Sequence, residues 1–141
     1  MTDTQKMMIG LALGFAILVM PSVPHAGMLP SQALQSAERF LSMLDNQQWD
    51  KAYQAAAEPL RLLNRKQDWI DEQSRRHQLL GQAQQRQLTA VRTRDHYPGL
   101  PDGNYLIILY TTRTPTKQKA REVLVLKGVA ESWQVCSYSL R

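Results

Sequence analysis

The strongest constraint on the fold is a change in hydrophobic period near residue 82. Before that point, apolar residues recur every three or four positions, as Leu34, Ala37, Leu41 and Leu44 do, which is the spacing of one helical face. After it, apolar and polar side chains tend to alternate along short segments rich in β-forming residues, as expected of strands. Helices followed by a run of antiparallel strands indicate an α+β fold.

The helical half predicts three helices. The first begins with Ser31 as its N-cap. It ends at Asp45-Asn46, since both of these side chains compete with helical backbone bonding. The second spans residues 49–56 and is broken by Pro59, after which residues 60–63 form a short turn. The third is capped by Asp68 and ends at Gly81, where a glycine in a left-handed conformation is expected.

The second half predicts four antiparallel strands, over residues 84–94, 104–114, 122–127 and 132–140. The first strand is polar, which is typical of a sheet edge, and the second is apolar on both faces, which is typical of a central strand. In the last strand, alternation places Cys136 on the same face as Tyr138. Three helices on such a sheet resemble cystatin-like and NTF2-like folds, in which a curved sheet often encloses a conical pocket.

The first 26 residues have the features of a secretory signal peptide. Residues 7–20 carry no charge, Lys6 precedes them, and a proline-containing stretch that ends in Ala26 follows them. We therefore expect cleavage after Ala26, a single α+β domain over residues 27–141, and a periplasmic or secreted location. The alternative is an uncleaved inner-membrane anchor, because Pro24 is unfavourable three residues before the cut.

Charge and cysteine content exclude several classes of function. The formal net charge is +5, but the cations are scattered and form no basic block, so nucleic-acid binding is not expected. Cys136 is the only cysteine, which excludes an internal disulfide and a site built from thiolates alone. We expect it to be a core residue, because a nucleophilic cysteine needs a neighbouring base.

The histidines do not predict a metal site. His25, His77 and His96 lack the spacing that a zinc site requires, so neither a metal nor another cofactor is expected. Asp95, His96 and Asp102 could form an acid–base cluster in one loop. We interpret the two aspartates as turn formers and His96 as a surface residue.

Three carboxylates near the start of the third helix offer a further basis for a catalytic alternative. Asp68, Asp71 and Glu72 would interact favourably with the helix dipole, which explains them without catalysis. One of them could instead be the general base of an NTF2-like pocket enzyme, provided that it is buried among apolar groups.

Aromatic and basic residues each allow two interpretations. Trp49, Tyr53 and Trp69 are expected in the core, although they could line a ligand pocket. Four cations surround the predicted hairpin turn at residues 115–118, where we expect a solvated hairpin, with contact to anionic lipid or an acidic partner as the alternative: Arg113, Lys117, Lys119 and Arg121.

Several short motifs from Ala37 to the C-terminus together resemble those of a known family. They are Ala37-Glu38-Arg39-Phe40-Leu41, Leu44-Asp45, Trp49, Tyr53, Trp69, Leu79-Leu80-Gly81, Arg86-Gln87-Leu88, Leu100-Pro101-Asp102-Gly103-Asn104-Tyr105, Glu122, Trp133-Gln134-Val135 and Tyr138. In this combination the chain resembles the bacterial exported family DUF4019, a domain of unknown function. Ser137 departs from the pattern, since a glycine is expected before the final tyrosine. The resemblance implies export and the helix-then-sheet order, and it implies no activity.

These observations favour an exported envelope protein that acts as a non-catalytic binding or protein-interaction module. The expected partner is another envelope protein at the sheet edge or a small hydrophobic ligand in a pocket. We expect membrane contact only through the N-terminal helix, if that helix is not cleaved, in which case the chain would be a membrane-anchored structural protein. The catalytic alternative is the NTF2-like pocket enzyme with a buried carboxylate as its base.

Overall fold

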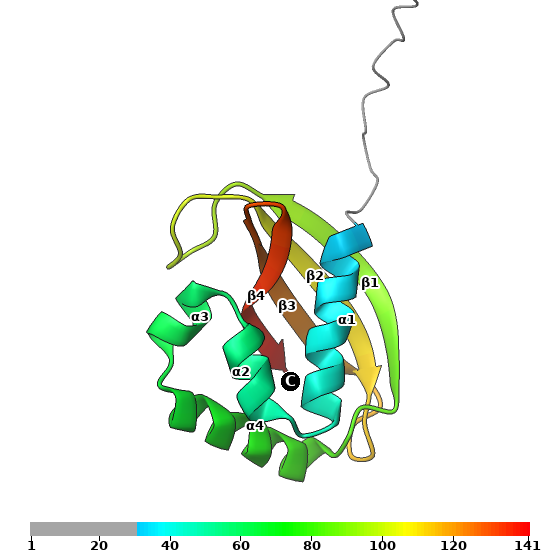
Figure 1. The fold of residues 1–141 in the computed structure, drawn as a ribbon. Coiled ribbons are helices and arrows are strands. Elements are labelled where there is room, and N and C mark those ends of the chain that lie inside the picture. Colours follow the sequence, from blue (N-terminus) through cyan, green and yellow to red (C-terminus); the bar gives the residue numbers. More distant parts are fainter. Residues whose placement is uncertain (1–30) are drawn as a thin grey trace, which may run out of the picture.

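The computed structural model describes residues 31–141, and these form four helices followed by four strands (Figure 1). The elements are α1 (Ser31–Asp45), α2 (Trp49–Ala55), α3 (Glu58–Leu63), α4 (Lys66–Leu80), β1 (Gln85–Arg94), β2 (Tyr105–Arg113), β3 (Ala120–Val129) and β4 (Ser132–Leu140). The predicted signal helix and its cleavage site lie outside the described residues. No helix in the described part of the chain has the length and apolar character needed to cross a membrane.

The four strands form one antiparallel sheet in the order β1-β2-β3-β4, so each strand pairs with its neighbour in sequence. The predictions of an α+β fold, an edge position for β1 and a central position for β2 are confirmed. The central strands β2 and β3 hold most of the buried strand residues, whereas β1 and β4 form the two edges. The edges are therefore the places where backbone groups can face outward.

The helical half differs from expectation at Pro59. Residues 60–63 belong to a helix, α3, because Pro59 lies in its first turn, where a missing N–H breaks no helical hydrogen bond. The N-cap of α4 is Arg65, and Asp68 lies within the first turn, where it accepts a hydrogen bond from Arg65 Nε at 2.7 Å. Gly81 is the C-cap of α4 with a φ of 78°, as predicted, although its ψ of −179° is extended instead of left-handed helical.

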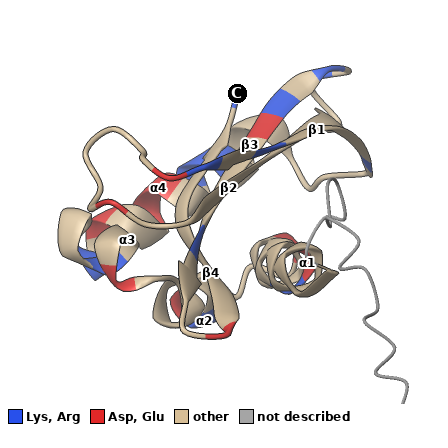
Figure 2. Cartoon of the chain, turned by 90° about the horizontal axis from the view of Figure 1, so that it is seen from above, with Lys and Arg blue, Asp and Glu red and all other residues tan. Residues whose placement is uncertain are grey.

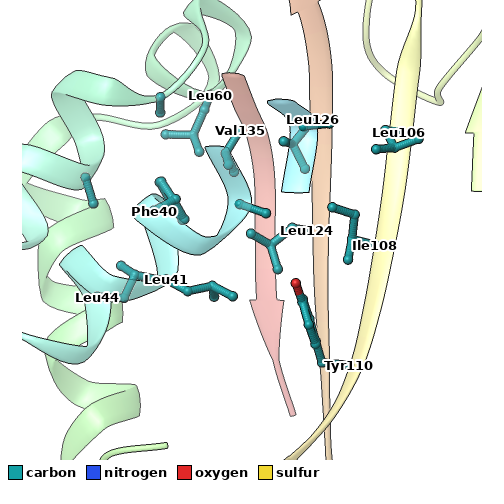
Figure 3. Close-up of a cluster of buried hydrophobic side chains, with 14 of the residues drawn as sticks. Phe40, Leu41, Leu44, Leu60, Leu106, Ile108, Tyr110, Leu124, Leu126 and Val135 are labelled. Atoms are coloured by element: carbon teal, nitrogen blue, oxygen red, sulfur yellow. The ribbon is translucent and has the colours of Figure 1, made fainter. Parts of the chain in front are cut away.

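The main core lies between the helices and one face of the sheet (Figure 3). Phe40, Leu41 and Leu44 of α1 point toward strand residues such as Ile108 and Leu124, and all five are buried. Burial of a side chain of this size contributes about 1.5–3 kcal/mol to folding. The apolar stripe of α1 that was read from the sequence is therefore the face that covers the sheet.

The aromatic residues of the helices belong to this core, as expected. Trp69 of α4 is buried, and its ring centroid lies 6.3 Å from that of Phe40 and 5.8 Å from that of Tyr53. Trp49 and Tyr53 are partly buried against the same cluster. The tilted ring pairs fix the position of α4 relative to α1 and α2.

A second, smaller core lies on the other face of the sheet. Tyr105, Val125 and Cys136 pack there, and Tyr97 and Leu100 of the β1–β2 loop contribute to it. Cys136 was expected on the face of Tyr138, and this prediction is wrong. A β-bulge pairs Val125 with Ser137 and Leu126 with Val135, which leaves Cys136 as an extra residue and shifts the alternation.

The β2–β3 hairpin is not simply solvated. Thr116 Oγ1 donates hydrogen bonds to the backbone carbonyls of Leu79 at 3.0 Å and Leu80 at 3.1 Å, the last residues of α4. Pro115 lies against Gly81, close enough that a Cβ at position 81 would be 2.7 Å from the Pro115 ring. The hairpin turn therefore caps the C-terminus of α4, while its four cations remain exposed as expected.

Candidate functional site

The three carboxylates of the catalytic alternative are exposed. Asp68 pairs with Arg65, Glu72 accepts a hydrogen bond from Arg76 at 2.9 Å, and Asp71 accepts one from Gln67 at 2.8 Å. None is buried among apolar groups, which is the condition that a general base in a pocket has to meet. The condition under which these residues could serve a pocket enzyme is therefore not met.

The histidine loop lies on the surface as expected. His96 Nδ1 lies 2.8 Å from Asp102 Oδ1, and both side chains are mostly exposed. The other histidine in the described residues, His77, packs edge-on against Trp49 with ring centroids 6.1 Å apart. Within residues 31–141, no three histidine, cysteine or carboxylate side chains gather as a metal site would require.

The structure instead buries a carboxylate that the sequence analysis did not consider as a site residue. Glu122 of β3 is 0% exposed and faces the helices. Its carboxylate accepts hydrogen bonds from Arg86 Nε at 2.6 Å, from Thr112 Oγ1 at 2.7 Å and from the Tyr138 hydroxyl at 2.8 Å. Three donors from three strands thus satisfy one buried anion.

Arg86 extends this arrangement to the first helix. Its two terminal nitrogens donate to the two carboxylate oxygens of Asp45, at 2.6 and 2.7 Å, in a bidentate pair. Burial alone would lower the pKa of Arg86, but the hydrogen bonds and charges of Asp45 and Glu122 raise it above its ordinary value. The guanidinium is therefore permanently charged, and we call Asp45, Arg86, Glu122 and Tyr138 the ion network.

The ion network is only partly accessible, since the side chains of Arg86 and Asp45 are 19% and 25% exposed. It borders a cavity of about 40 Å³, which has room for a water molecule but not for a substrate. All buried side-chain nitrogen and oxygen atoms in the described residues have a hydrogen-bond partner. Together with Thr112, the network thus joins α1 to the four strands, and within residues 31–141 the main core fills the space between the helices and this face of the sheet, where the expected folds often enclose a pocket.

Larger hollows lie beside β4, at the edge of the sheet. One, of about 220 Å³, lies between α3, α4, the β1–β2 loop and the segment 136–138. Another, of about 300 Å³, lies between α4 and the end of β4 at Leu140 and Arg141. Glu72 contributes to the walls of both, and we call the two together the β4–α4 groove.

The walls of the β4–α4 groove combine apolar and polar side chains and are partly accessible. Leu63 of α3 and Leu79 of α4 belong to its two ends, and they are 67% and 68% exposed. Tyr97 and Leu100 line the first hollow, and Leu140 lines the second. Large exposed leucines beside a recess are a common feature of binding surfaces.

The backbone of β4 turns hydrogen-bonding groups toward this groove. Arg121 and Arg141 exchange both backbone hydrogen bonds, at 2.8 and 3.0 Å. Because hydrogen-bonding direction alternates along an antiparallel strand, the N–H and C=O of Leu140 and of Tyr138 point away from β3. Of the outward groups of β4, the carbonyl of Val135 accepts a hydrogen bond from the N–H of Ala57 at 2.8 Å.

Cys136 lies on the floor of the first hollow. Its Sγ donates to the carbonyl of Val125 at 3.3 Å, and burial raises the pKa of the thiol to about 11. A thiol in this state is protonated at neutral pH and is a weak nucleophile. The placement of Cys136 in a core is therefore confirmed.

Together these features define a small α+β protein whose buried ionisable groups are paired with one another and which has a recess beside the edge strand β4. Residues 36–138 match the family described as Protein of unknown function (DUF4019), and the chain belongs to that family. The match confirms the resemblance that was found in the sequence motifs. No curated protein matches the chain.

Proposed function

We propose that this protein is an exported, non-catalytic module that binds an extended segment of another envelope protein in the β4–α4 groove. The observation that carries the proposal is the coincidence of outward backbone groups at Tyr138 and Leu140 with two hollows that the exposed leucines Leu63 and Leu79 border. A bound segment would add a fifth strand to the sheet, and its main chain would hydrogen-bond to this edge.

The spacing of the groove suits such a strand. Tyr138 and Leu140 are two residues apart, so a paired segment would meet an outward N–H and C=O at every second position. Its side chains would alternate, and those on the helix side would meet Leu79 and Leu63. We therefore expect the bound segment to carry apolar residues at alternate positions.

The absence of catalysis in this proposal rests on the state of the ionisable groups. The buried anion, Glu122, is held by three donors, and the carboxylates on α4 are exposed. The thiol of Cys136 has a raised pKa and no neighbouring base among its hydrogen-bond partners. Each group is thus explained by packing or by an ion pair.

Export is supported by the leader sequence. The uncharged segment 7–20 and the small residue Ala26 match a secretory signal, and α1 begins at Ser31, shortly after the expected cut. Mass spectrometry of the protein from fractionated cells tests this part. We expect a periplasmic species that starts at Gly27, and a full-length species found only in the cytoplasm would contradict export.

Photo-crosslinking in the producing cell tests the groove. A photoreactive phenylalanine analogue replaces Leu79, or Val129 as the control, because both side chains are exposed but Val129 lies at the β3–β4 turn away from the groove. We expect a discrete adduct with one envelope protein from position 79 and none from position 129. Adducts of equal yield from both positions, or none from either, would contradict the proposal.

A further inference from the structure

On the face of the sheet that is turned away from the helices, the strand residues include exposed cations and no carboxylate. Ile108 and Leu124 point into the main core, so the residues next to them, such as Leu109 and Val123, point to the other face. The register places four cations on or beside that outer face, and we call them the basic cluster: Arg92, Arg113, Lys119 and Arg121. All four are exposed, and none makes an ion pair with another described residue.

Acidic side chains are confined to other parts of the domain. Within the four strands the one carboxylate is that of Glu122, and it faces the core. In Figure 2 most acidic positions lie on the helices and loops, whereas basic positions lie along the strands and the hairpin as well as on the helices. The strand residues of the outer face are therefore positively charged, and the nearby carboxylates of Asp95 and Asp102 lie in the β1–β2 loop, at the opposite end of β2 from the hairpin.

The basic cluster surrounds an apolar hollow. A recess of about 300 Å³ is lined by Leu109, Thr89 and Thr111, with Lys119 and Arg121 among the lining residues. Val123 next to it is half-buried. Apolar atoms at the centre and cations around them match the boundary between the acyl chains and the headgroups of a bilayer.

We propose that the outer face of the sheet docks on a membrane surface that contains anionic phospholipid. In the docked state, the basic cluster contacts lipid phosphates, and Leu109 lies against the glycerol and upper acyl region. The aliphatic stems of the lysine and arginine side chains cover the apolar hollow while their charged ends reach the phosphates.

A bilayer fits this surface better than an acidic protein does. The cations are spread over three strands and the hairpin, and the headgroups of a bilayer can meet each of them without a fixed register. An acidic protein would need carboxylates at matching positions and would gain little from an apolar hollow at the centre. The surface is distinct from the β4–α4 groove, so the inference does not rest on the proposed peptide binding.

Vesicle partitioning of the full chain tests the inference. The probes are vesicles of phosphatidylcholine alone and vesicles in which roughly a third of the lipid is phosphatidylglycerol. The variant R113Q/K119Q/R121Q removes three cations of the basic cluster. The control R39Q/K51Q/R61Q removes three exposed cations from the helices and leaves the same net charge. Residues 1–30 are the same in every protein, so the ratio of the two partition coefficients reports the folded surface.

We expect the anionic vesicles to bind the wild-type protein at least about tenfold more strongly than the neutral vesicles. We expect the cluster variant to lose most of this ratio and the control variant to keep it, with both retaining the thermal unfolding temperature of the wild type. Equal binding of the wild type to both vesicles would overturn the inference. An equal loss of binding in the two variants would also overturn the inference, because it would show that the vesicles sense only the net charge of the protein. Binding to an acidic protein but not to anionic vesicles would overturn it as well.

Discussion

The guanidinium of Arg86 donates its Nε hydrogen to a carboxylate oxygen of Glu122 at 2.6 Å, although Glu122 has no exposed surface. An isolated carboxylate in such a place would cost several kcal/mol. Thr112 and Tyr138 complete its hydrogen bonds, and Asp45 holds the other side of Arg86. The fold therefore depends on the whole ion network, since removal of one member leaves another buried and unsatisfied.

Replacement of Arg86 by methionine should be strongly destabilising. The change leaves the Glu122 carboxylate without its counterion, and the expected loss is about 3–5 kcal/mol in the free energy of unfolding. Urea denaturation measures it. The control is Arg65→Met, which breaks an exposed ion pair and should cost less than about 1 kcal/mol.

The double variant Arg86→Met with Glu122→Leu should recover part of that loss. It removes the buried charge together with its partner, and Asp45 can be hydrated because it is partly exposed. If the double variant loses more unfolding free energy than the two single variants lose in sum, the network is not coupled.

The thiol of Cys136 should make stability depend on alkaline pH. Its pKa is about 11 in the folded protein against an ordinary value of 9.0, so the folded state binds the proton more tightly than the unfolded state. The stabilisation is complete below pH 9 and is lost as the pH rises toward 11. Tyr105, Tyr110 and Tyr138 add to the loss, because burial also raises the pKa of each.

Comparison with Cys136→Ala isolates the contribution of the thiol. At about pH 10.5 the wild type should have lost about 1–2 kcal/mol more of its neutral-pH unfolding free energy than the variant has. Parallel stability curves for the two proteins would mean that the thiol ionises in the fold as easily as it does in water.

Gly81 and Gly99 form a matched pair for testing the contact between the hairpin and α4. Both have a φ of 78°, but a Cβ at Gly81 would lie 2.7 Å from Pro115, whereas a Cβ at Gly99 meets nothing within 4 Å. Gly99→Ala should cost about 1 kcal/mol from backbone strain alone. Gly81→Ala should cost clearly more, because the hairpin must also move, and thermal unfolding of the two variants compares them. Equal losses would show that the hairpin does not press on this helix end.

Sequence periodicity predicted those parts of the fold that depend on local pattern. The apolar stripe of α1 and the apolar pattern of the strands indicate directly which of their residues are buried. These elements were therefore predicted at the correct positions. The prediction of a turn after Pro59 was wrong because a proline can either end a helix or begin one. The predicted face of Cys136 was wrong because a bulge adds one residue to β4 and shifts the alternation of the following side chains by one position.

The ion network and the groove could not be derived from pattern alone. Asp45, Arg86, Glu122 and Tyr138 all occur in the motifs that carried the family resemblance, yet each is an isolated residue in the sequence. Arg86 and Glu122 are 36 positions apart, and a single charged residue in a strand normally indicates a solvated face. Only the register of the four strands and the end of α1 brings them together.

The central claim is that β4 binds a partner through its outward backbone, and crosslinking from position 79 in a chain with Leu140→Pro tests it most directly. Proline removes the outward N–H of residue 140, whereas Leu140→Ala trims the same side chain and keeps that donor. The account predicts at least a tenfold loss of adduct in the proline variant and a largely retained adduct in the alanine variant, with similar unfolding temperatures. An adduct yield that is the same in the two variants would contradict it.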